Sequence, residues 1–155
     1  MTRTAERGSV SIEVAVLAPA FIALMVLAGM VGRTAVAAEA IETAAHDAAR
    51  AASISRDFRT AEDEALVAAR QQLDWRGLAC SNDLHPALTG HMAGKPSSFE
   101  EAFGSPVGTD ATVTVVIVCK VSFKDVALGF LPGMPTEKEI SATFTSPLDR
   151  YRSRR

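Results

Sequence analysis

The sequence predicts an α+β protein with a long N-terminal helix, a second short helix and a small antiparallel sheet. Three patterns carry this prediction: an uncharged run at 14–32, helical spacing with many alanines after it, and alternation of apolar and polar residues at 111–123. At 155 residues the chain has room for one small domain with appendages. We expect a cytoplasmic leader at 1–8, a transmembrane helix at 9–33, an Ala-rich helical extension at 34–59 and an extracytoplasmic head at 60–155.

The charge balance argues against a nucleic-acid-binding surface. The chain has 16 Lys and Arg against 18 Asp and Glu, a formal net charge of -2. A nucleic-acid-binding domain would carry a basic excess on one face. We therefore expect no nucleic acid as a partner.

The uncharged run at 14–32 has the length of a membrane helix. Its nineteen residues would span about 28 Å as a helix, close to the hydrocarbon thickness of a bilayer, and Arg33 ends it. A secretory signal peptide is one alternative, with Ala35, Val36 and Ala37 as its cleavage site, but its apolar core is normally shorter. An uncut single-pass anchor is another. In the anchor alternative Glu13 would be an interfacial carboxylate reaching the headgroups, whereas in the signal-peptide alternative it stands where the apolar core should begin.

Glu13 has a role in a third interpretation, in which the chain is cut after Gly8. Ser9 then becomes the first residue and Glu13 the fifth. Glycine leaves the bond open to a peptidase, and the basic residues Arg3 and Arg7 hold the leader in the cytoplasm. The new amine of Ser9 could pair with Glu13 of a neighbouring helix, and an unpaired buried carboxylate would be heavily penalised.

This N-terminus resembles the type IV prepilin signature, and more narrowly the TadE-like pseudopilins of tight-adherence (Flp pilus) systems. The matching positions lie between about residues 7 and 53, and Val14 stands where many members have an aromatic residue. The positions that match are Gly8, Glu13, Pro19, Arg33, Ala49 and Arg50.

The resemblance implies a non-enzymatic, minor pilin-like subunit that a prepilin peptidase processes between Gly8 and Ser9. Glu13 would select incoming subunits during assembly of a pilus or secretion apparatus used in adhesion. The implied partners are the peptidase, other pilin-like subunits, the assembly machinery and membrane lipid. The implied location is the cell membrane, with a single pass, a cytoplasmic N-terminus and the head outside or in an extracellular pilus. The alternative is an anchored or secreted binding module that belongs to no pilus.

The Ala-rich extension carries a narrow apolar stripe at helical spacing, Ile41, Ala45, Ala48 and Ala52. Such a stripe suits close packing against the protein's own sheet or a neighbouring subunit, and a solvated stalk that lifts the head is equally compatible with it. A second helix is predicted at 60–75, with Thr60 and Asp63 as a capping pair and acids in its first turn.

Two strands are predicted in the head. The odd positions of 111–123 are all apolar, as expected for a strand with one buried face, and 139–144 places Ile140, Ala142 and Phe144 on one face. A wide loop containing Pro132 and Gly133 would join them as an antiparallel pair. Residues 81–110 are rich in Gly, Pro, Ser and Asn without a sustained period, and are interpreted as a long surface loop.

The only two cysteines are Cys80 and Cys119. If the head lies outside the cytoplasm, its environment allows the two thiols to be oxidised to a disulfide. One disulfide would tie the irregular segment to the sheet. Two buried free thiols are the alternative. No C-x-x-C pair is present, which disfavours redox catalysis.

No pattern in the sequence indicates catalysis or a cofactor. We find no nucleophile with a base, no acid pair and no phosphate-binding loop, and His85 and His91 have no Cys, Asp or Glu at metal-site spacing. The terminal sequence DRYRSRR carries four arginines. It is either a solvated tail or a contact for an anionic partner.

Overall fold

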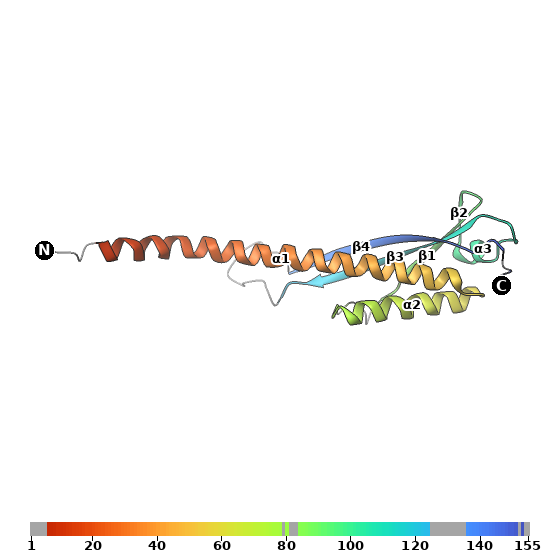
Figure 1. The fold of residues 1–155 in the computed structure, drawn as a ribbon, viewed down its shortest axis with the longest axis horizontal. Helices are drawn as coiled ribbons and strands as arrows, with labels where there is room; N and C mark the ends of the chain where they lie inside the picture. Colours follow the sequence, from red (N-terminus) through yellow and green to blue (C-terminus); the bar gives the residue numbers. More distant parts are fainter. Residues whose placement is uncertain (1–5, 79, 81–83, 125–135, 152, 154–155) are drawn as a thin grey trace.

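The computed structural model has one elongated body built on a single long helix (Figure 1). It describes residues 6–78, 80, 84–124, 136–151 and 153, and the side chains of residues 6–11 are excluded from the description. The elements in chain order are α1 Glu6–Ile54, α2 Phe58–Trp75, β1 Ala87–Met92, β2 Lys95–Ser97, α3 Phe99–Phe103, β3 Ala111–Ser122 and β4 Glu137–Pro147. The predicted α+β class is confirmed.

Helix α1 is continuous over 49 residues, about 74 Å, and includes Pro19. Its N-terminal part projects away from the rest of the molecule, whereas its C-terminal part runs beside the sheet and α2 (Figure 1). The predicted membrane segment and the Ala-rich extension therefore form one rod.

The alanine stripe packs within the protein's own head. Ile41, Ala45, Ala48 and Ala52 are each 0% exposed. Because α1 contacts α2, β3 and β4, a methyl-sized stripe lets both layers approach the helix closely. This confirms the packing against the protein's own sheet and excludes a solvated stalk.

Helix α2 begins two residues earlier than predicted, and its cap is Asp57 instead of Thr60. The Asp57 carboxylate accepts a hydrogen bond from the backbone N–H of Thr60 at 2.9 Å. Hydrogen bonding with the Thr60 side chain, and then with this backbone N–H, lowers the pKa of Asp57. Thr60 is thus the donor to the cap, and the acids that follow it lie beyond the first turn. The buried side of the helix has one residue every four: Ala61, Ala65, Ala69 and Leu73.

The sheet has four antiparallel strands in the order β2-β1-β3-β4. The predicted pairing of the two long strands is confirmed, with Cys119 opposite Ile140 and Ile117 opposite Ala142. The odd positions of β3 are buried as predicted. The loop predicted between these strands lies largely at 125–135, outside the described residues.

The prediction of a long loop at 81–110 is wrong, because this segment contains β1, β2 and α3. Ala93 and Gly94 both have positive φ and form a two-residue hairpin turn between Met92 and Lys95. Gly90 allows a close approach, because a Cβ there would lie 2.4 Å from the Ala102 Cβ. Each element is too short to show a sustained hydrophobic periodicity. The Gly, Pro, Ser and Asn residues of the segment therefore led to its interpretation as a loop.

Cys80 and Cys119 form a disulfide, so the free-thiol alternative is wrong. Their Cα atoms are 5.5 Å apart, and the bond ties the segment after α2 to the buried face of β3. The head therefore has a covalent link between the segment that follows α2 and β3.

Candidate functional site

The predicted processing site lies near the start of α1. Gly8 and Ser9 are in its first turns, since the helix begins at Glu6. Cleavage between them stays a prediction.

The N-terminal part of α1 presents large apolar side chains outward. By length and composition it is the one helix among the described residues that could cross a membrane. A soluble core helix would bury such residues, whereas these are more than 40% exposed: Ile12, Val14, Val16, Leu17, Phe21, Ile22, Leu24, Met25, Leu27 and Val31.

Glu13 lies at the beginning of this apolar surface and is exposed. No ion pair joins it to any side chain that the structure describes. A carboxylate in this position is available to a group from outside the chain. Chemically it can accept hydrogen bonds from, and pair with, a cation such as an ammonium group.

The head begins to cover α1 before the uncharged run has ended. Met30 is 7% exposed and belongs to the core, and Val26 packs against it. Ala37, which the signal-peptide alternative places at its cleavage site, is 1% exposed inside the same core. Cleavage there would remove helical residues that the head buries, which disfavours a secretory signal peptide.

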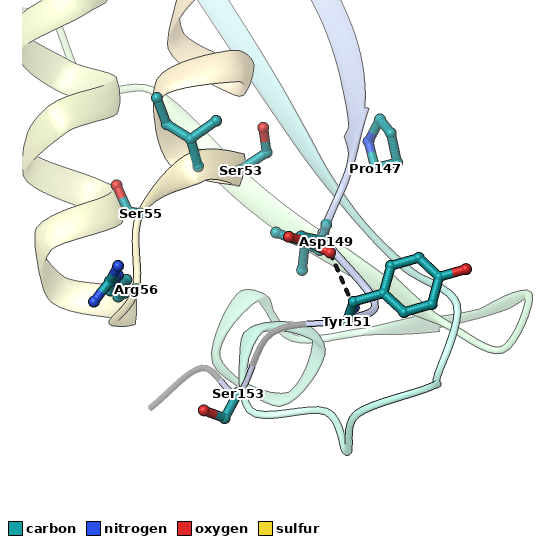
Figure 2. A pocket seen from close by; sticks show the side chains of 9 residues that line it. Ser53, Ser55, Arg56, Pro147, Asp149, Tyr151 and Ser153 are labelled. Carbon is teal, nitrogen blue, oxygen red and sulfur yellow. Dashed lines mark hydrogen bonds between the residues drawn. The ribbon is translucent and has the colours of Figure 1, made fainter.

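A cavity of about 570 Å³ lies at the end of the head far from the N-terminus. Figure 2 shows it between the end of α1 and the end of β4, where Asp149 Oδ1 accepts a hydrogen bond from the backbone N–H of Tyr151 at 2.9 Å. Its walls combine residues near 53–56 with residues near 147–153. Sequence analysis missed this cavity because neither segment has a local motif, and only the tertiary fold brings them together.

The histidines do not gather into a metal site. Among the described residues, no group of three His, Cys, Asp or Glu side chains could hold an ion. The His46 ring lies edge-on to Phe144 with centroids 4.5 Å apart, and its Nδ1 is 3.1 Å from Asp47 Oδ1. His85 and His91 are exposed.

Part of the basic C-terminus has a structural role. The Arg150 guanidinium pairs with the Asp110 carboxylate, and the backbone carbonyl of Arg150 accepts a bond from Gly108 N–H at 2.8 Å. Tyr151 is exposed, and Arg152, Arg154 and Arg155 lie outside the described residues. The solvated-tail interpretation is therefore incomplete at Arg150, which anchors the end of β4.

Comparison of the chain with protein-family models, with curated proteins and with solved structures finds no match.

Proposed function

We propose that this protein is a membrane-inserted, pilin-like subunit of the TadE-like type. A prepilin peptidase removes residues 1–8, and the remaining chain contributes to assembly of a tight-adherence pilus or a related secretion apparatus. The observation that carries the proposal is the exposed Glu13 carboxylate at the beginning of a lipid-compatible helix surface.

The spacing of Ser9 and Glu13 supports a pairing between neighbouring helices. Four residues of helix correspond to a rise of about 6 Å, and positions i and i+4 lie on the same face. A parallel neighbour displaced by one turn would bring its free Ser9 amine level with Glu13. Pairing offsets the cost of a carboxylate near hydrocarbon, so helices in the correct register are favoured.

The head has properties that agree with a location outside the cytoplasm. It contains a disulfide, which persists in oxidising compartments and is rare in the cytosol. The basic leader residues Arg3 and Arg7 favour a cytoplasmic N-terminus, so one crossing would place the head on the opposite side.

The first experiment is the intact mass and N-terminal sequence of the protein recovered from membranes of its own host. We expect a chain that starts at Ser9. A chain that starts at Met1 would be an uncut anchor, and one that starts near Ala38 would be a secreted domain. Either result would refute the pilin-like function.

The assembly role of Glu13 is tested by E13A, with E42A as a matched control. Glu42 is an exposed acid on the same helix but lies beside the sheet, outside the apolar run. We expect E13A to insert into membranes and to lose co-assembly with other pilin-like subunits, while E42A keeps both properties. Normal piliation in E13A would contradict the mechanism.

The second candidate is an anchored binding module, and the cavity beside Tyr151 favours it. Its activity would depend on the cavity and not on cleavage after Gly8. A Y151A variant that loses adhesion in cells with normal pili, together with E13A cells that adhere normally, would favour this function over the first.

A further inference from the structure

Two contacts show how β4 lies along α1. The Ser146 hydroxyl donates to the Ser53 hydroxyl at 3.0 Å, and the Phe144 ring meets the His46 ring at a centroid distance of 4.5 Å. Residues earlier in the strand therefore lie beside residues earlier in the helix. Figure 1 shows the same arrangement, with β4 running along α1.

These contacts locate the start of β4 along the helix. From Ser146 back to Glu137 is nine residues, or about 30 Å of strand. The same length of helix contains about 20 residues. Counted back from Ser53, this places Glu137 level with Arg33, where the uncharged run ends.

Two further observations agree with this level. The core of the head extends down α1 to Met30. In Figure 1 the N-terminal end of β4 and the C-terminal end of β3 reach farther toward the N-terminus of α1 than α2 does. If α1 spans a membrane, no stalk separates this end of the sheet from the bilayer surface.

We call this part of the head the basal end, defined by Lys124, Thr136, Glu137 and Lys138. The Phe123 N–H donates to the Thr136 carbonyl at 2.8 Å and closes the strand pair there. Lys124 Nζ lies 3.4 Å from Glu137 Oε1, with the Lys124 side chain 69% exposed, and Lys138 is also exposed. The basal end thus carries two ammonium groups at the level of Arg33, that of Lys138 and that of Lys124, which pairs with Glu137 in the structure.

We propose that the basal end rests on the non-cytoplasmic surface of the membrane that α1 crosses. There Lys124 and Lys138 donate hydrogen bonds to phospholipid phosphates. Lysines near a membrane surface gain from attraction to headgroups, and their long stems allow the ammonium to reach them. The inference rests on the membrane insertion of α1 in the proposed function.

Docking of the head sets the depth of Glu13. Glu13 and Arg33 are twenty residues apart, about 30 Å of helix, which equals the hydrocarbon thickness. With the basal end on the outer surface, Glu13 lies at the inner boundary of the hydrocarbon. Outward movement of the subunit would then draw the carboxylate into lipid, where a neighbour's amine is needed.

The test uses the fact that Trp75 is the only tryptophan in the chain. Trp75 is 76% exposed, so W75F gives a background without tryptophan fluorescence and with little change in packing. Three probes are added singly to it: T136W at the basal end, Y151W at the far end, and F21W in the apolar run. T136W and Y151W are reconstituted into vesicles of phosphatidylcholine and anionic phosphatidylglycerol brominated on acyl carbons near the headgroup. F21W is reconstituted into the same lipids brominated near the middle of the acyl chains.

We expect T136W to be quenched several-fold more strongly than Y151W, and F21W to be quenched as well. Quenching of F21W with equal, weak quenching of T136W and Y151W would overturn the docking and leave the membrane span intact. An unquenched F21W would instead refute the insertion of α1, and both proposals with it.

The role of the two lysines is tested by adding K124Q and K138Q to the T136W protein. We expect T136W quenching to fall toward the Y151W value. The control is K95Q, which removes an exposed lysine from β2. Unchanged quenching in the double variant, or an equal fall in K95Q, would overturn the contact with phosphates.

Discussion

The two halves of α1 are both apolar helix, yet they differ in the size of the side chains on their surfaces. The N-terminal half presents Ile, Val, Leu, Phe and Met outward, and Met25 is 73% exposed. The C-terminal half buries alanines such as Ala45 and Ala48 at 0% exposure. Large flexible side chains fill space against a fluid neighbour, whereas methyl groups allow a sheet and a helix to pack closely.

The difference teaches that the two halves of one helix meet different packing demands: the first half is long and apolar enough to cross a membrane, and the second is packed inside the head. Lipid adapts to any side-chain shape, so a helix segment suited to lipid is constrained mainly by its hydrophobicity. The second half contacts a packed, solid-like core, where one extra methylene matters. The predictions below test this contrast, beginning with the largest expected effect.

Removal of the disulfide should destabilise the head strongly and leave the exposed apolar half of α1 unaffected. Cys80 and Cys119 are 39 residues apart in sequence, and closing such a loop contributes about 4 kcal/mol in the chain-entropy model. We expect C80A/C119A to lower the free energy of unfolding by this amount in urea titrations in detergent. Reduced wild type is the control, and a loss below about 1 kcal/mol in either protein would contradict the prediction.

Enlarging one alanine in each half tests the contrast directly. We expect A48L to destabilise the head by about 1–3 kcal/mol, because Ala48 is fully buried and the added atoms must displace neighbours. A20L, in the exposed apolar run, should change stability by less than about 0.5 kcal/mol. Urea midpoints in detergent measure both, and equal effects would show that the two halves are not packed differently.

The Ser53 and Ser146 hydroxyls, which join α1 to β4, should contribute to the free energy of unfolding in a non-additive way. Ser146 donates to Ser53, and Ser53 donates to the Arg50 carbonyl at 2.9 Å. S53A leaves the buried Ser146 hydroxyl without its acceptor, so we expect a loss of about 1–2 kcal/mol. S53A/S146A should cost less than the sum of the single changes. Strict additivity in this double-mutant cycle would mean that the hydrogen bond contributes little.

The smallest expected effect is a dependence of head stability on acidic pH. Hydrogen bonds with Thr60, first from its side chain and then from its backbone N–H, hold the pKa of Asp57 below 3.8 in the folded state. Glu101 accepts a hydrogen bond from the backbone N–H of Ser98, the N-cap of α3, and hydrogen bonds with Ser98 hold the pKa of Glu101 below 4.5. A lowered folded pKa stabilises the protein above the unfolded value, and this contribution is lost as pH falls through the folded value. We expect the stability gap between wild type and D57A/E101A to shrink as pH falls from 6 to about 2.

Urea midpoints at several pH values measure this gap. The conservative variant D57N/E101Q, which keeps the acceptor oxygens, is the control and should lie between wild type and D57A/E101A at neutral pH. A stability gap that widens as pH falls would contradict the hydrogen bonds assigned to the Asp57 and Glu101 carboxylates.

The fold was predictable where one hydrophobic pattern continues over many residues. The alternation at 111–123 identified β3 and its buried face. The alanine spacing at 41–52 identified the stripe on α1 that is buried, but left a solvated stalk equally compatible with it. Short elements were missed: β1, β2 and α3 each have six residues or fewer. The cap of α2 was misplaced because Thr60 and Asp57 both have side chains that can cap.

The candidate functional residues also fall into two groups, those that a local sequence pattern indicates and those that only the fold brings together. Gly8, Ser9 and Glu13 form a local pattern that needs no tertiary structure, and their processing and assembly roles stay predictions. The cavity near Tyr151 and the basal end near Lys124 join residues distant in the chain. No local pattern can indicate such sites.

The sequence by itself determined the long helix, its uncharged segment, the main strand and the single cysteine pair, because each depends on local periodicity or on residue chemistry. Only the tertiary structure decided that the alanine stripe is buried in the head, that the disulfide forms, and that the core of the head extends along α1 to Met30. These features depend on distances between segments far apart in the chain. Such distances follow from close packing of the whole core, which no single segment encodes.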